Sequence, residues 1–268
     1  MSETRNSGYP PKTPERRAGR EQMMTHLVLS LFPGIGLLDR AFEEEGFCVV
    51  RGPDVLWGGD IKRFHPPAGR FDGAIGGPPC QAFSDLVHLV RQRYGDDRVA
   101  ENLIPEFERV VCEARPAWFL MENVPAAPLP ATEGYAISDL VLNNRWVGGE
   151  QNRVRRFSFG MRGDRRVSLD PYLEVALFEP IGWAPAVTAS RGQQFIRMGS
   201  AGVPKKNIAP RKPSGVYLRD SLRLQGLPAD FLDKAPFTSE GKQRVIGNGV
   251  PLPMGRAIAK AVRDALAS

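Results

Sequence analysis

A cysteine in a rigid loop is the residue of this sequence whose setting most strongly indicates chemistry. Cys80 ends the run GGPPC at residues 76–80, which follows the short apolar segment FDGAI. Because prolines fix the backbone, this loop would present the thiol at the end of a strand. A cysteine thiolate forms accessibly near neutral pH and is the nucleophilic species. We therefore predict that Cys80 is a covalent nucleophile.

A carboxylate at a second strand end would assist such a nucleophile. Glu122 lies in MENVP, residues 121–125, after the apolar run AWFL. A thiolate that adds to C6 of cytosine breaks the aromaticity of the ring and makes C5 nucleophilic. The addition becomes easier if a carboxyl group protonates N3 or hydrogen-bonds to it. Without Cys80, the same run would fit an ordinary polar turn.

Cationic residues alternate in QNRVRR, residues 151–156. On a strand, Gln151, Arg153 and Arg155 would share one face. Their side chains could stabilise the thiolate, bind the carbonyl oxygen of a base or hold phosphates. A solvated edge strand fits the same alternation, so this pattern leaves both interpretations open.

Glycine turns and nearby acidic residues predict a ligand pocket. The run FPGIG, residues 32–36, lets a ligand approach the backbone between a strand and a helix. Asp54 follows the next strand, where an acidic residue commonly holds a ribose hydroxyl, and Asp60 could contact an adenine or an amino group. The turn GNGV, residues 247–250, could return an amide to the same pocket. Each feature alone also fits an ordinary turn or a solvated loop.

Apolar strand-like runs alternate with helical patterns along the chain. The expected strands are LVLSLF (27–32), a buried CVV (48–50), FDGAIGG (71–77) and AWFLMENV (117–124), and the expected helices are 35–47, 102–114 and 254–268. This order predicts an α/β fold with a mostly parallel, doubly wound sheet, helices on both faces and ligands at the carboxyl ends of the strands. The expected organisation is a flexible tail (1–23), a catalytic domain (24–160), a small irregular region (161–217) and a C-terminal return to the catalytic domain (218–268).

Composition narrows the class of protein. The 268 residues carry a net charge of +6, which permits a polyanionic partner. Three scattered cysteines fit neither a disulfide framework nor a zinc site, and we expect no metal. No apolar run is long enough to cross a membrane and no signal peptide is evident, so we expect a cytoplasmic protein.

Taken in order, seven motifs resemble those of bacterial and phage DNA cytosine-5 methyltransferases. They are LFPGIG, GGDI, GGPPCQ, MENV, QNRVRR, RDSLRLQGLP and IGNGVP, and they span about residues 27 to 262. The resemblance implies the Rossmann-like class I fold that uses S-adenosylmethionine, with a small target-recognition subdomain. It also implies double-stranded DNA as substrate and action as a monomer, with or without a cognate restriction enzyme.

The resemblance assigns roles residue by residue. Catalysis falls to Cys80, Glu122, Arg153 and Arg155. The cofactor pocket would be formed by Phe32, Gly34, Gly36, Asp54, Asp60, Ile61, Pro79, Asn248 and Val250. The loop with Gln81, Ser84 and Arg98 would close over DNA. Beyond the resemblance, we predict further DNA contacts from Gln151 and from Arg191, Gln193, Gln194 and Arg197, with Lys205, Lys206, Arg211 and Lys212 on phosphates. Charged loop residues of this kind are equally often only solvated.

The sequence departs from this family at several points. Ser30 stands where the family usually has Asp, Leu37 replaces a common glycine, and Asp54 stands where Glu is usual. Few residues separate QNRVRRFSFG from RDSLRLQGLP, where the family places its target-recognition domain, so we predict a short or relaxed recognition sequence. Two other functions are possible. The chain could be a tRNA-acting enzyme, although the Cys-Phe-Thr sequence characteristic of that branch is absent here, or a DNA-binding protein without catalytic activity.

Overall fold

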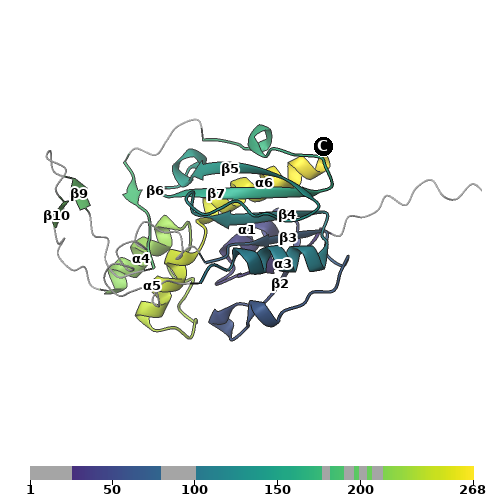
Figure 1. Cartoon of the computed structure of the whole chain (residues 1–268). Helices are drawn as coiled ribbons and strands as arrows, with labels where there is room; N and C mark the ends of the chain where they lie inside the picture. The colour runs from purple at the N-terminus through teal and green to yellow at the C-terminus, as the bar shows by residue number, and fades with distance from the viewer. Residues whose placement is uncertain (1–25, 80–100, 177–181, 190–195, 199–203, 207–213) are drawn as a thin grey trace, which may run out of the picture.

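The computed structural model describes residues 26–79, 101–176, 182–189, 196–198, 204–206 and 214–268 (Figure 1). Several sequence predictions lie outside these residues: the tail, and the site residues Cys80, Gln81, Ser84, Arg98, Arg191, Gln193, Gln194, Arg211 and Lys212. Within the described part of the chain, no helix is both long and apolar enough to cross a membrane.

A six-stranded sheet forms the centre of the molecule (Figure 1). Its order is β2 (Cys48–Arg51), β1 (Leu27–Leu31), β3 (Gly73–Gly76), β4 (Trp118–Asn123), β7 (Val154–Arg162) and β5 (Tyr135–Asn143). The pairs from β2 to β4 are parallel, whereas β7 is antiparallel to both β4 and β5. The prediction of a mostly parallel α/β sheet is confirmed. The expectation that the CVV segment is buried is wrong, because β2 is an edge strand that is largely exposed.

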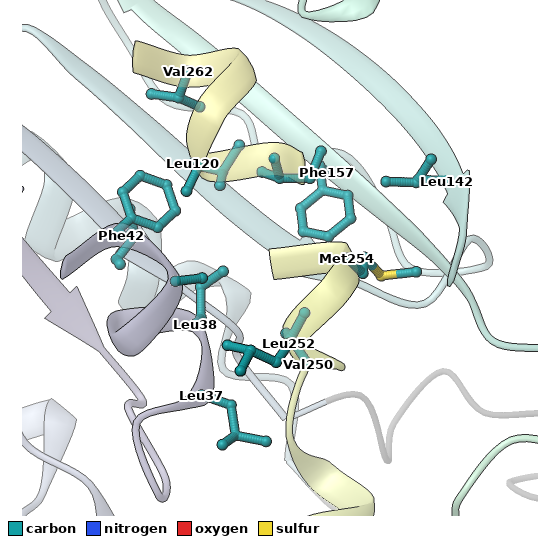
Figure 2. Close-up of a cluster of buried hydrophobic side chains, with 14 of the residues drawn as sticks. Leu37, Leu38, Phe42, Leu120, Leu142, Phe157, Val250, Leu252, Met254 and Val262 are labelled. Atoms are coloured by element: carbon teal, nitrogen blue, oxygen red, sulfur yellow. The ribbon is translucent and has the colours of Figure 1, made fainter. Parts of the chain in front are cut away.

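Helices cover both faces of the sheet, as predicted. On one face, α1 (Leu37–Glu44) packs against α6 (Leu252–Ala267), and Phe42, Leu120, Phe157 and Val262 meet in the core between helices and sheet (Figure 2). On the other face lies α3 (Ile104–Ala114). The buried residues of α3 recur every three or four positions, which is the spacing that places them on one helix face.

The antiparallel pair β5–β7 was not predicted as a pair, yet it determines the site. Polar residues such as Ser138 and Asp139 interrupt the apolar pattern of β5, which is an edge strand and only partly buried. Because β7 runs opposite to β4, its first residues lie beside the last residues of β4, and Arg156 is registered with Asn123. The start of β7 therefore reaches the carboxyl edge of the parallel strands.

The predicted continuous strand over residues 151–156 is interrupted. Gln151–Asn152 form β6, which pairs with β8 (Ala184–Pro185), and β7 begins only after Arg153. Further elements are the helices α4 (Ser214–Leu224) and α5 (Ser239–Asn248), several short 3-10 helices, and a ribbon of β9 (Ile196–Met198) and β10 (Pro204–Lys206). The expected boundary between residues 217 and 218 falls inside α4.

Candidate active site

A cavity of about 550 Å³ opens at the carboxyl ends of β1, β3 and β4. This is where α/β sheets bind ligands, and the volume lies in the usual range for small-molecule sites. The predicted site residues that line it are Phe32, Gly34, Asp54, Ile61, Pro79, Glu122, Arg153, Arg155, Asn248 and Val250. The fold thus brings together residues that are separated by more than two hundred positions in the sequence.

The turn after β1 is built from left-handed backbone. Gly34 has a φ of +56°, and a Cβ added there would meet no atom within 4 Å, so its backbone faces open space. Gly36 differs, because a Cβ there would lie 2.6 Å from Nη2 of Arg51. Gly36 does not line the cavity; it allows the chain to turn beneath the Arg51 guanidinium. Its predicted contact with a cofactor stays a prediction.

Asp54 holds two loops of the cavity together. One carboxylate oxygen accepts a hydrogen bond from Gly34 N at 2.9 Å and the other accepts one from Leu56 N at 2.7 Å. Trp57 reinforces this connection, since its indole Nε1 donates to the carbonyl oxygen of Gly34 at 2.8 Å. Each Asp54 oxygen can accept a further hydrogen bond. The position is therefore compatible with the predicted ribose contact.

Asp60 does not line the cavity. Its carboxylate caps the short helix η2 (Ile61–Arg63) by accepting from Lys62 N at 3.0 Å, and it lies 3.7 Å from Arg63 Nε. One Asp60 oxygen is used at the helix start, and the predicted contact of Asp60 with a ligand stays a prediction. Its neighbour Ile61 is buried and lines the cavity.

Glu122 and Arg155 form an ion pair in the cavity wall. The distance from Arg155 Nε to Glu122 Oε1 is 2.9 Å, and the two side chains are only 14% and 11% exposed. Gly77 makes room for the carboxylate, because a Cβ there would lie 2.9 Å from Glu122 Oε2. A close ion pair between two largely buried side chains restrains the position of the carboxyl group. One Glu122 oxygen is therefore bound to arginine and the other lies beside the glycine loop.

Asn123 is a site residue that the sequence did not single out. Its Nδ2 donates to the carbonyl oxygen of Pro78 at 3.2 Å, and its Oδ1 accepts from Val124 N at 2.9 Å. Asn123 is buried, so these bonds tie the end of β4 to the loop that leads to Cys80. Its position directly after Glu122 was the available signal.

Arg153 fastens the far wall of the cavity. Its buried guanidinium donates to the carbonyl oxygens of Val187 at 2.8 Å, Gly247 at 3.1 Å and Gly249 at 3.2 Å. These contacts join the segment that follows β8 to the last turn of α5 and the residue after it. Arg153 thus positions backbone around the cavity, and its predicted role beside a thiolate stays a prediction.

Gln151, for which a DNA contact is predicted, has a side chain that is bound to other parts of the protein. The side chain is fully buried, its Nε2 donates to Leu224 O and Gln225 Oε1, and its Oε1 accepts from Val187 N at 3.0 Å. All of these partners belong to the protein. Gln151 therefore links β6 to the end of α4 and to the segment that follows β8.

A buried carboxylate lies next to Ser30. Asp39 accepts a hydrogen bond from Ser30 Oγ at 2.5 Å and forms an ion pair with Arg51 Nε at 2.9 Å. Burial raises the pKa of Asp39 above its ordinary value, although Ser30 and Arg51 act in the opposite direction. Both Ser30 and Asp39 border the cavity. A carboxylate is therefore present beside position 30 even though that residue is serine.

We expect Asp39→Asn to change the pH dependence of stability. A raised pKa in the folded state means that the carboxyl contributes stability below its unfolded pKa, which is lost as the pH rises through the folded pKa. Asparagine cannot ionise, so the variant does not lose this stability as the pH rises. The ion pair with Arg51 contributes little to the stability of the wild type, because Arg51 is 55% exposed. The melting temperature of the variant relative to wild type should therefore rise as the pH increases from about 4, the usual pKa of an unfolded aspartate, through the raised pKa of the folded state.

Thermal unfolding across that pH range checks this expectation. Asp164→Asn, at an exposed carboxylate, is the matched control and should show no such trend. A variant that loses stability relative to wild type as the pH rises would mean that the bonds from Ser30 and Arg51 outweigh burial.

Comparison with known proteins identifies the family. The model of C-5 cytosine-specific DNA methylase matches residues 58–181. Type II methyltransferase M.AquIA of Picosynechococcus sp. is 39% identical over 187 residues, which cover 52% of this chain and 73% of that relative. M.HgiDI of Herpetosiphon aurantiacus is 31% identical over 166 residues, and the match covers 50% of this chain and only 52% of the relative.

A solved structure supports the fold. The Entamoeba histolytica methyltransferase EhMeth is similar with a TM-score of 0.58 at 14% identity, over 90% of this chain and 98% of that one. This likeness concerns the fold, and the identity to M.AquIA concerns the family. The chain therefore belongs to the family of C-5 cytosine-specific DNA methylases.

Proposed function

We propose that this protein transfers a methyl group from S-adenosylmethionine to C5 of cytosine in double-stranded DNA, with Cys80 as covalent nucleophile. The observation that carries the proposal is the Glu122–Arg155 pair, which lies in the cavity wall against the glycine-proline loop. That loop is described up to Pro79, the residue before Cys80. Family membership supports the same reaction.

The cavity suits a nucleoside-bearing cofactor. Its volume of about 550 Å³ is sufficient for a ligand of this size. Phe32 and Ile61 offer apolar surface for an aromatic ring, and Asp54 offers carboxylate oxygens for ribose hydroxyls. The cofactor, when bound, supplies a methyl group made transferable by its positively charged sulfur. Phe32, Asp54, Ile61, Pro79, Asn248 and Val250 would hold it.

The residues of the chain would perform the remaining steps. The Cys80 thiolate forms a bond to C6 of the cytosine while Glu122 delivers a proton, or a hydrogen bond, to N3. The ring electrons displaced by this bond make C5 the nucleophile that accepts the methyl group. Loss of the proton from C5 then returns the electron pair, expels the thiolate and restores the aromatic ring. Arg155 holds Glu122 in position through its ion pair.

The target base must leave the duplex to reach Glu122, because C5 and C6 are hidden in the stacked helix. The β9–β10 ribbon is a candidate surface for the surrounding DNA, since Arg197 is registered opposite Lys205 on its two strands. Both residues belong to the predicted set of DNA contacts. Basic residues mounted on an ordered ribbon can hold phosphates or read base edges.

A methyl-transfer assay tests the proposed function. The purified protein should move label from methyl-labelled cofactor to duplex DNA and not to tRNA. Transfer to tRNA alone would identify an RNA-acting enzyme. DNA binding without transfer, and without a covalent adduct on DNA that contains 5-fluorocytosine, would identify a binding protein and refute the proposal.

We expect the modified sites to share a short or relaxed sequence. The described part of the region between β7 and α4 contains only short strands and one short 3-10 helix, which offer few positions from which side chains can read bases. Bisulfite sequencing of DNA methylated by the purified protein measures this directly. A single fixed site of about six or more base pairs would contradict the expectation.

A further inference from the structure

Arg244 lines the cavity, although neither the motifs nor the predicted roles single it out. It lies on α5 four positions before Asn248, so the two side chains share one face of the helix. Both residues are exposed and both border the cavity. One wall of the pocket therefore presents a guanidinium next to an amide.

This wall is fixed in position by close packing. A Cβ on Gly249 would lie 2.6 Å from the side chain of Leu37, and one on Gly247 would lie 2.2 Å from the backbone of Thr188. Gln225 Nε2 donates to Gly249 O at 3.2 Å, in addition to the bonds from Arg153. Leu37 is the first residue of α1, so the end of α5 adjoins the beginning of α1.

The other lining arginines are already engaged. Arg153 is bound to three carbonyl oxygens, and Arg155 is bound to Glu122. Among the described residues, no carboxylate forms an ion pair with Arg244. Arg244 thus brings to the cavity a guanidinium that no described carboxylate holds in an ion pair, although Glu240 lies about one turn before it on α5.

The first turn of α1 lies beside this wall. α1 begins at Leu37 after Gly36, and no side chain caps its first amides. Asp39 in this turn is already bound by Ser30 and Arg51. The N-terminus of a helix carries a partial positive charge. The acidic residue Asp54 belongs to a different wall, the loop between β2 and β3, where its oxygens already accept two amides. A ligand with a carboxylate at one end would therefore place it between α1 and Arg244.

We propose that Arg244 binds the carboxylate of the amino-acid part of the cofactor. A guanidinium can contact both carboxylate oxygens at once, which gives a strong and directional interaction. This inference rests on the proposed function, because it assumes that the cavity holds S-adenosylmethionine. Arg244 would then recognise the amino-acid part of the ligand, whereas the residues named above contact its nucleoside.

Two ligands that differ at this end provide the test. S-adenosylhomocysteine carries the carboxylate, whereas 5′-methylthioadenosine keeps the nucleoside and sulfur without it. Calorimetry should show that Arg244→Gln weakens S-adenosylhomocysteine binding about tenfold or more while 5′-methylthioadenosine binding changes less than about twofold. Arg244→Lys should recover part of the loss. Lys242→Gln, on the same helix but outside the cavity lining, is the matched control.

The outcomes separate this inference from the function on which it rests. Unchanged S-adenosylhomocysteine binding by Arg244→Gln would overturn the inference alone, and a simultaneous loss of DNA affinity would instead place Arg244 on a phosphate. Equal weakening of both ligands would also overturn it, because the residue would then only shape the wall. Failure of the wild-type protein to bind either ligand would overturn the proposed function itself.

Discussion

Replacing Cys80 with alanine should lower methyl transfer to DNA by a factor of about 10⁴ or more. The thiolate makes C5 reactive by adding to C6, and no neighbouring group can replace that bond. The described loop ends at Pro79 in the cavity lining, close in sequence to the nucleophile and in contact with the Glu122 wall. Cofactor binding should persist, because the pocket residues are unchanged.

Single-turnover transfer and denaturing gels measure this effect. Wild-type protein should form a covalent adduct with DNA that contains 5-fluorocytosine, and Cys80→Ala should form none. Cys112→Ala is the matched control, since Cys112 is a free, exposed thiol on α3. Substantial transfer by Cys80→Ala would refute the covalent mechanism.

Glu122→Gln should reduce the rate of methyl transfer by about 10²-fold to 10⁴-fold. Glutamine keeps the shape of the side chain and can still donate a hydrogen bond, but it cannot deliver a proton to N3. It also removes the charge that pairs with Arg155 at 2.9 Å, so the orientation of the group is less well defined. The loss should appear in kcat, with little change in cofactor affinity.

Steady-state kinetics at several DNA concentrations separates kcat from KM for this variant. Glu106→Gln is a suitable control because Glu106 also pairs with an arginine, Arg109, on the outer helix α3. Assays should be run well below the melting temperature of the variant, which loses a largely buried ion pair. A loss confined to KM would assign Glu122 to binding and not to proton transfer.

Local sequence patterns were sufficient for the parallel part of the fold. The predicted strands at residues 27–32, 71–77 and 117–124 and the three predicted helices are present, because each carries its own apolar periodicity. β5 could not be recognised in this way. β5 is held by nine register pairs with β7. A pattern read over a few neighbouring residues of the sequence does not reveal such a partner strand.

Site residues were predictable where the chemistry depends on residue type at a strand end, as for Glu122. They were not predictable where the role depends on a distant partner. The alternation of Gln151 with arginines suggested a surface residue. Its side-chain amide instead donates hydrogen bonds to residues 73 and 74 positions away. Asp60 is predicted to contact a ligand, and one oxygen of its carboxylate also starts a short helix.

The bonds from Arg153 to the turn after α5 also set the order in which the pocket can be completed during synthesis. The guanidinium and its acceptor Gly249 are 96 positions apart in the chain. At roughly 5–20 residues per second, the ribosome needs about 5–20 s to make that intervening length. During this interval the nascent chain already contains Glu122 and Arg155 but lacks the cavity wall around Asn248. The cofactor pocket is therefore completed only after the catalytic residues have been synthesised.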